Sequence, residues 1–390
     1  MSVPQQNITK APIDPTSLIG KTVTVYFTKT KFKFQGELEN NIIKGSINQS
    51  GNSLPLTLKK GAFLSLQRPQ EPKPPFPYYT EDISFYNTTD NITLKGTLSL
   101  PQKKGKYPAA IIISSSGPQD RDGLVYGHKP YLLLADYLTR NGVAVLRFDE
   151  RGVGKSEGTF KTASLTDFST DVEAALSFLK ERKEINNSKI GLIGHSIGGI
   201  IAPKMAAQDK TIAYVVMMVG PGINGDELLL LQKAAFERLS GLPEATIKQS
   251  QDFAKDGYNI ITKSSLQNDL LKDSISDFYQ KKYGALVPEK QLEVLVSSIT
   301  SPEVVGLLRA KPNDYLSKVT SPILAINGSK DFQVTPKENL AAIRAIFEKN
   351  GNKNSKAIEL ENLNHLFQEC KIGSLQEYSE LEQTMSPKAL

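Results

Sequence analysis

The chain has 390 residues, of which 39% are hydrophobic and 23% charged, a globular composition that excludes long disordered or collagen-like regions. No apolar run approaches the roughly 20 residues needed to span a bilayer, so we expect no membrane span. The single cysteine excludes an internal disulfide framework, and three histidines leave little for a metal cluster.

The formal net charge of +6 is concentrated in residues 1–78, which hold ten Lys and Arg against four Asp and Glu. These basic residues are spread along strand-like sequence without a block of like charges, so we interpret them as solvated strand faces and expect no nucleic-acid partner. The chain does not begin with a basic segment followed by an apolar stretch. That predicts a cytoplasmic protein, or a periplasmic or secreted one whose signal peptide has been removed.

The first part of the chain, residues 1–68, predicts a small antiparallel β domain. Apolar residues alternate with polar ones there, as at Val23, Val25 and Phe27, and turns rich in Asn, Ser and Gly separate the runs. Five prolines follow within residues 69–78. Proline-rich sequence favours an extended, semi-rigid chain, so we predict a linker there between two domains.

Residues 79–390 predict an α/β domain with a doubly wound, mostly parallel sheet. A hairpin is expected first, and continuous apolar runs typical of buried parallel strands then alternate with segments of helical periodicity. About 100 residues, 221–320, interrupt this alternation with helical patterns, which is too long for a crossover and predicts an inserted helical cap. The apolar runs are residues 109–113, 143–146, 190–193, 214–219, 323–326 and 357–360.

The pattern G-x-S-x-G occurs at residues 154–158 and again at residues 194–198. The second match directly follows the predicted strand 190–193 and precedes residues 199–207, which predict a helix. Strand, sharp turn and helix are the context of a nucleophile elbow, in which flanking glycines leave room for a strained backbone that exposes the serine hydroxyl. The amino end of the helix favours developing negative charge. We therefore predict Ser196 as the nucleophile.

The first match is interpreted as a structural loop. A polar segment separates Ser156 from the strand before it, and no helix starts directly after it. The sequence Gly154-Lys155-Ser156 also matches the end of the phosphate-binding loop motif. That loop requires a glycine where Asp149 stands, so we expect no nucleotide site.

A serine nucleophile needs a base, and the base needs a carboxylate that orients it. His195 precedes Ser196 within the predicted elbow, so its side chain should point elsewhere and packing is its favoured role; His128 is also interpreted as structural. His365 follows the last predicted strand, where a loop can reach the elbow, and is predicted as the base. Asp331 follows the strand before that and is predicted as the orienting acid, with a turn aspartate as the alternative. The order Ser, Asp, His is that of α/β-hydrolases.

From about residue 80 to its end, the sequence resembles an α/β-hydrolase-fold serine hydrolase, and it is similar to a bacterial group of esterases grouped with proline-aminopeptidase-like hydrolases. The resemblance implies the α/β-hydrolase fold and an esterase that uses the triad predicted above. The β domain weakly resembles, in shortened form, the small domain that often precedes such hydrolases. The segments that carry the resemblance are residues 116–123, 147–154, 194–199, 220–222, 327–331 and 364–365.

An oxyanion hole needs two backbone N–H groups that face the substrate carbonyl. One is the amide of the residue after the nucleophile, Ile197, and the other comes from the loop after the strand at 109–113. Pro118 has no N–H and is excluded. The resemblance points to Ser116, with Gly117 as the alternative. Members of the resembled group often have glutamate in place of Ile197, a difference that leaves the amide in place but bears on substrate specificity.

We therefore expect a serine carboxylic-ester hydrolase that acts through an acyl-enzyme on short- to medium-chain, small-molecule esters, with no cofactor and no metal. An aminopeptidase-like peptide hydrolase is one alternative, and it would need a carboxylate of the cap for the substrate amine, for which Glu227 and Glu237 are candidates. A non-catalytic binding protein on a hydrolase scaffold is another, against which an intact triad argues. A homodimer is an option that the sequence leaves open.

Overall fold

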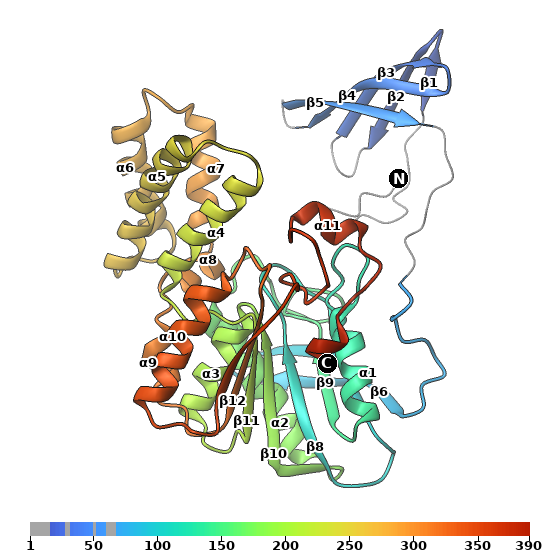
Figure 1. Cartoon of the computed structure of the whole chain (residues 1–390), viewed down its shortest axis with the longest axis vertical. Helices are drawn as coiled ribbons and strands as arrows, with labels where there is room; N and C mark the ends of the chain where they lie inside the picture. Colours follow the sequence, from blue (N-terminus) through green and yellow to red (C-terminus); the bar gives the residue numbers. More distant parts are fainter. Residues whose placement is uncertain (1–15, 28–31, 50–51, 60–67) are drawn as a thin grey trace. The chain divides into compact units, whose positions relative to one another are not determined.

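The computed structural model describes residues 16–27, 32–49, 52–59 and 68–390 (Figure 1). The chain forms two compact units. The smaller comprises Met1–Gln67 with Val125–Gly127, and the larger comprises Arg68–Leu124 with His128–Leu390. The larger unit holds every predicted site residue.

The smaller unit contains a five-stranded antiparallel sheet in the order β1-β2-β3-β4-β5, as the sequence predicted. Asn40 and Asn41 both have a positive φ, so they form a tight turn that suits the twist between two antiparallel strands. Val25 is paired with Phe34, which is paired with Ile47, so apolar side chains share one face of the sheet. The strands are β1 Ser17–Ile19, β2 Thr22–Phe27, β3 Phe32–Glu39, β4 Ile42–Gln49 and β5 Asn52–Lys59.

The larger unit is built on an eight-stranded sheet in the order β13-β12-β11-β10-β8-β9-β7-β6. The strands from β8 to β13 are parallel, and the predicted hairpin β6–β7 joins them antiparallel at one edge. The apolar runs of the sequence lie in these parallel strands, which confirms those predictions. The strands are β6 Tyr79–Asn87, β7 Ile92–Leu100, β8 Tyr107–Ile113, β9 Ala144–Phe148, β10 Ile185–His195, β11 Tyr214–Met218, β12 Ile323–Gly328 and β13 Lys356–Leu360.

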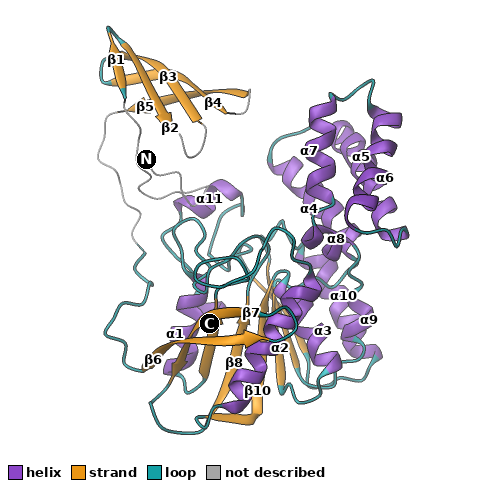
Figure 2. Cartoon of the chain, turned by 180° about the vertical axis from the view of Figure 1, so that it is seen from behind, coloured by secondary structure: helices purple, strands orange, loops and turns teal. Residues whose placement is uncertain are grey.

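Helices cover both faces of this sheet (Figure 2). Along β8, Ile111 and Ile113 belong to the core that α2, α3 and α10 share, whereas Ala110 and Ile112 belong to the core with α1 on the other face. Helix α2 begins where Ser164 and the side chain of Asp167 exchange hydrogen bonds in a capping box. These helices are α1 Pro130–Arg140, α2 Leu165–Glu181, α3 Gly198–Gln208 and α10 Pro336–Lys349, followed near the C-terminus by α11 Leu375–Glu380 and a short 3₁₀ turn, η3 Pro387–Ala389.

A group of helices between β11 and β12 occupies the position of the predicted cap. Figure 1 shows α4 to α8 together, beyond one end of the strands. They enclose a core of their own, which includes Ile261, Ile275 and Tyr279. No helix in the described part of the chain is both long and apolar enough to cross a membrane. The helices are α4 Gly225–Leu239, α5 Glu244–Lys263, α6 Asn268–Tyr283, α7 Glu289–Ile299, α8 Pro302–Leu308 and α9 Pro312–Leu316.

The proline-rich segment is bonded to the C-terminal part of the chain. Arg68 Nη1 donates to the carbonyl of Leu381 at 2.9 Å, and Gln70 Nε2 donates to the carbonyl of Met385 at 2.7 Å. Gln70 Oε1 accepts the amide of Thr384 at 2.6 Å. The segment expected to act as a spacer belongs to the larger unit, and its beginning is bonded to C-terminal residues of that unit. The domain boundaries expected from the sequence remain predictions.

Candidate active site

Ser196 lies in a sharp turn between β10 and α3. Its φ is 54°, in the left-handed region that residues with a side chain rarely adopt. A Cβ on Gly194 would stand 1.9 Å from the carbonyl oxygen of Gly198, and a Cβ on Gly198 would stand 2.4 Å from that of Ile113. Both glycines are therefore required for the turn to close against β8. This turn directs the partly exposed Ser196 away from the strand, as in a nucleophile elbow.

His365 and Asp331 are joined by a hydrogen bond. His365 Nδ1–H donates to Asp331 Oδ2 at 2.8 Å, and both side chains are buried. The other carboxylate oxygen, Oδ1, accepts the amides of Gln333 at 2.8 Å and Val334 at 3.1 Å. Because both oxygens are held, the carboxylate fixes the histidine tautomer and leaves Nε2 as the basic nitrogen.

The loop that carries His365 is held by the residue before it. Asn364 Oδ1 accepts the amides of Leu366 at 3.0 Å and Gln368 at 2.9 Å, and Asn364 itself is fully buried. This local turn fixes the backbone on both sides of the histidine. Within the described residues Ser196 Oγ has no hydrogen-bond partner, and contacts of this kind often form only when substrate is bound.

In the loop after β8, most backbone N–H groups donate to side chains elsewhere in the protein. Between residues 115 and 119, Pro118 has no N–H, and the amide of Ser116 is the one N–H without an acceptor among the described residues. The Ser116 amide is therefore unbonded among the described residues, whereas the amide of the alternative, Gly117, has an acceptor. The bonded amides are those of Ser115, to Tyr131 Oη at 2.9 Å, Gly117, to Glu303 Oε1 at 2.9 Å, and Gln119, to Glu150 Oε2 at 2.8 Å.

The amide of Ile197 stands at the amino end of α3. It, too, has no acceptor in the part of the chain that the structure describes. The partial positive charge of the helix end adds to the attraction that this N–H exerts on an anion. Ile197 and Ser116 thus offer two unbonded backbone donors near the elbow.

A narrow cavity beside these amides is lined by Ile197 and three carboxyl groups. Asp171 is one of them and is bound to Arg151, and the other two are the buried Glu150 and the half-buried Glu303. Burial raises the pKa of Glu150 to about 8, and it also raises the pKa of Glu303 above its ordinary value. Glu150 is therefore held largely protonated near neutral pH. Sequence reasoning missed both residues. The partners Gly117 and Glu303 are 186 positions apart, so no local pattern could have indicated their contact.

Among the described residues His195 makes no hydrogen bond with Ser196, and its ring lies against that of His365. It is buried, and both ring nitrogens are within hydrogen-bond distance of a partner: Nε2 of the carbonyl oxygen of His365 at 3.0 Å, and Nδ1 of Tyr131 Oη at 3.2 Å. Burial lowers the pKa of its imidazole to about 3. His128 is likewise buried between Thr384 and Gln368, and burial lowers its pKa to about 4.

The surroundings of Ser156 differ from those of Ser196. Ser156 Oγ donates to the carbonyl of Asp149 at 2.7 Å and accepts the amide of Lys95 at 2.9 Å. The Asp149 carboxylate accepts the amide of Lys155 at 3.0 Å and binds the guanidinium of Arg121 at 2.8 Å. The hydroxyl is thus used to tie a loop to β7.

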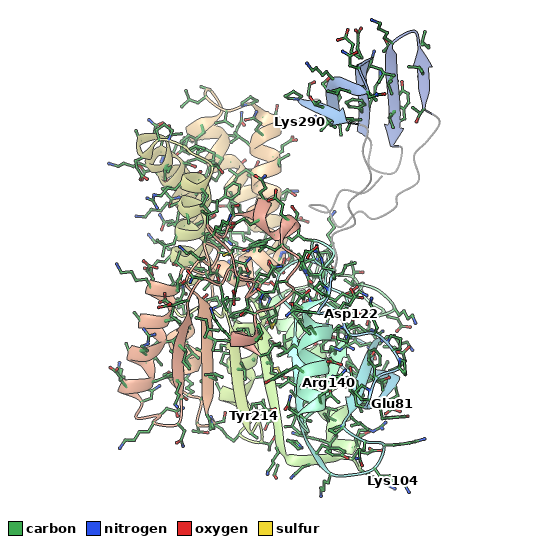
Figure 3. All side chains as sticks on the ribbon, turned by 45° about the vertical axis from the view of Figure 1, so that its right-hand side comes forward. Glu81, Lys104, Asp122, Arg140, Tyr214 and Lys290 are labelled. Carbon is green, nitrogen blue, oxygen red and sulfur yellow. The ribbon has the colours of Figure 1, made fainter. Side chains whose placement is uncertain are left out.

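The other candidate groups add little to the site described above. Glu237, one of the two cap carboxylates named from the sequence, accepts hydrogen bonds from Lys233 at 2.7 Å and Ser250 at 2.5 Å. No hydrogen bond or ion pair joins the other, Glu227, to the predicted triad among the described residues. Within the described residues no cluster of three His, Cys, Asp or Glu could hold a metal ion. At the opposite, amino end of the strands, Tyr214 of β11 (labelled in Figure 3) binds the carbonyl of Ala109 at 2.9 Å.

The similarities to known proteins include a family model, a sequence relative and a solved structure. Residues 123–369 match the family model described as serine aminopeptidase, S33. Esterase EstD of Thermotoga maritima is 26% identical over 292 residues, which are 74% of this chain and 62% of that protein, so the chain spans about three fifths of its length. The structure of the Pyrococcus furiosus esterase Pf2001 is 17% identical, with a TM-score of 0.47, over 78% of this chain and 91% of that one.

Proposed function

The chain belongs to the S33 serine aminopeptidase family of α/β-hydrolases, and on that premise we propose that it is a serine carboxylic-ester hydrolase acting through Ser196, His365 and Asp331. The observation that carries the proposal is the buried hydrogen bond of 2.8 Å from His365 to Asp331, on the loops that follow β13 and β12. These loops meet the elbow of β10 at the carboxyl ends of the parallel strands, where α/β folds place their reactive groups.

In the proposed mechanism His365 Nε2 removes the proton of Ser196, and Oγ attacks the carbonyl carbon of the ester. The carbonyl oxygen becomes negative and accepts hydrogen bonds from the amides of Ile197 and Ser116. Collapse of this intermediate breaks the bond to the alcohol, which takes the proton from His365. Water, activated by the same histidine, then attacks the acyl-enzyme and releases the acid. Asp331 stabilises the imidazolium form in both steps.

The cap supplies one wall of the proposed substrate pocket. Its helix α8 reaches the loop after β8, because Glu303 accepts the amide of Gly117 at 2.9 Å. This contact lies beside Ser116, so the proposed pocket would have α8 on that side. Short- to medium-chain esters are the substrates that we propose, and the panel of esters described below tests the chain length.

An aminopeptidase-like activity is a second candidate, and Glu303 is the observation that favours it. Its carboxyl group comes from the cap and lies beside the proposed oxyanion amides, where the amine of a peptide could be bound. Burial raises the pKa of Glu303 above its ordinary value, and this opposes the use, because burial disfavours the charged form that would bind an amine.

A substrate panel distinguishes the two activities. It consists of p-nitrophenyl esters from acetyl to lauryl beside aminoacyl-p-nitroanilides, each measured with the unchanged protein and with Glu303→Gln. We expect ester hydrolysis to exceed anilide hydrolysis and to survive in Glu303→Gln, since the amide side chain still accepts the Gly117 N–H. Turnover of anilides alone, abolished in Glu303→Gln, would establish the peptidase instead.

A further inference from the structure

Tyr131 and His195 connect two parts of the proposed active site that are far apart in sequence. Tyr131 comes from the first turn of α1, and His195 is the last residue of β10, directly before the nucleophile. Both side chains are buried, with 5% and 4% of their surface exposed. Neither has a part in the mechanism described above.

The donor and acceptor of each hydrogen bond in this connection are determined by chemistry. The carbonyl of His365 can only accept, so His195 Nε2 must carry the ring proton at the 3.0 Å contact. A neutral imidazole then has Nδ1 as its acceptor, so Tyr131 Oη–H donates to it at 3.2 Å. The tyrosine oxygen in turn accepts the amide N–H of Ser115 at 2.9 Å.

The two ends of this chain of hydrogen bonds belong to the groups that must be aligned for catalysis. Ser115 directly precedes Ser116, the proposed oxyanion donor, and the carbonyl at the other end is that of the proposed base itself. The rings of His195 and His365 also lie against each other, with their centroids 5.1 Å apart. Burial lowers the pKa of His195 to about 3, so the ring stays neutral near pH 7. The donor and acceptor of each hydrogen bond therefore do not exchange roles there.

We propose that Tyr131 and His195 are positioning residues, which align the amide of Ser116 with the backbone of His365 through a single tautomer of His195. The inference rests on the proposed function, since it assigns a role in that same site. Oxyanion donors and bases act only when held within a fraction of an ångström of the reactive geometry. The hydrogen bonds through Tyr131 and His195 tie the oxyanion donor and the base to α1 and β10, and so provide that alignment.

The first test is Tyr131→Phe, which removes one hydroxyl and leaves the partly buried Ser115 N–H and the buried His195 Nδ1 without their partner. On the ester that the unchanged protein hydrolyses best, kcat should fall about 10- to 100-fold with little change in KM, because stabilisation of the transition state is lost rather than binding of the substrate. The control is Tyr137→Phe on the same helix, whose side chain is 40% exposed and which should keep full activity. A Tyr131→Phe protein that is folded by circular dichroism and retains full kcat would overturn the proposal.

The second test separates positioning from packing at His195. The side-chain amide of a glutamine offers an NH2 donor group and an oxygen acceptor, so His195→Gln should retain most of kcat. In contrast, His195→Phe fills the space but should lose activity as Tyr131→Phe does. Equal activity of the two variants would contradict a role through hydrogen bonds.

The third readout does not depend on activity. Two-bond ¹H–¹⁵N spectra of the three histidines, assigned with His195→Gln and His128→Gln, should show His195 as the Nε2–H tautomer at pH 6 to 8. An Nδ1–H tautomer or a protonated ring would overturn the proposal. If Ser196→Ala retained activity, the proposed function would fail while this spectrum still tested the tautomer. If Ser196→Ala were inactive and Tyr131→Phe fully active, the positioning role alone would fail.

Discussion

The loops that carry Ser156 and Ser196 have the same pattern of glycines around serine, yet the two hydroxyl groups are used in different ways. Ser156 Oγ is bound on both sides by backbone groups, the carbonyl of Asp149 and the amide of Lys95. Ser196 has a positive φ and no hydroxyl partner among the described residues, and a helix begins two positions after it. A serine whose hydroxyl is already satisfied stabilises a loop, whereas one held exposed by a strained turn is available for reaction.

The carboxylates beside the two serines differ in the same way. Asp149 neutralises Arg121 and accepts loop amides, so its contacts are those of a structural ion pair. Asp331 has a histidine as its partner, and its other contacts are two local amides that fix its orientation. The comparison therefore predicts that substitutions of Ser196 and Asp331 affect the kinetics, whereas substitutions of Ser156 and Asp149 affect stability.

The largest effect should separate the two serines. Ser196→Ala should reduce kcat/KM for ester hydrolysis by about 10⁴-fold or more, because the attacking atom is lost, while Ser156→Ala should stay within about twofold. Steady-state kinetics on a p-nitrophenyl ester measures both. Similar losses in the two variants would remove the distinction between the loops.

The next effect should separate the two carboxylates. Asp331→Asn should lower kcat by up to about 10⁴-fold with little change in stability, because the histidine loses the partner that sets its tautomer. Asp149→Asn should leave kcat within a few-fold but lower the free energy of unfolding by about 3 kcal/mol, since Arg121 loses its buried partner. Kinetics and urea unfolding on both proteins check this. A stable, inactive Asp149→Asn would contradict the assignment.

A smaller effect concerns pH and Glu150, which follows Asp149 and binds the loop that carries Ser116. Its folded pKa of about 8 lies above that of an ordinary carboxyl group, so the folded chain holds a proton that the unfolded chain releases. This contribution to stability is complete at acid pH and is lost as the pH rises through about 8. Glu150→Gln should therefore show a flatter fall in the free energy of unfolding between pH 5 and 9. Parallel curves for the two proteins would mean that Glu150 is ionised throughout this range.

The smallest expected effect is on the stability of Ser156→Ala. The substitution leaves the amide of Lys95 without its acceptor, and a lost hydrogen bond of this kind costs about 1 kcal/mol. Urea unfolding beside Ser196→Ala, whose hydroxyl has no partner to lose, provides the matched control. A larger loss for Ser196→Ala than for Ser156→Ala would reverse the comparison.

Much of this arrangement could be predicted from the chain because its signals are local. The elbow at Ser196 is predicted by the glycine spacing between a strand and a helix. Asp331 and His365 come directly after strands whose apolar runs are clear in the sequence. The oxyanion loop could not be resolved in the same way. Whether Ser116 or Gly117 offers its amide depends on Glu303, a residue of the distant cap, and on which amides such side chains already occupy. Contacts of this kind arise only when the chain has folded.

The measurement that tests the central claim most directly is covalent labelling of the protein with a fluorophosphonate, followed by mass spectrometry of its peptides. Phosphonylation requires an activated serine, so the account predicts one label, on Ser196, present in Ser156→Ala and absent from Ser196→Ala. Labelling should also fall in Asp331→Asn, in proportion to the loss of kcat. A label on Ser156, or one that persists in Ser196→Ala, would contradict the claim that Ser196 is the nucleophile.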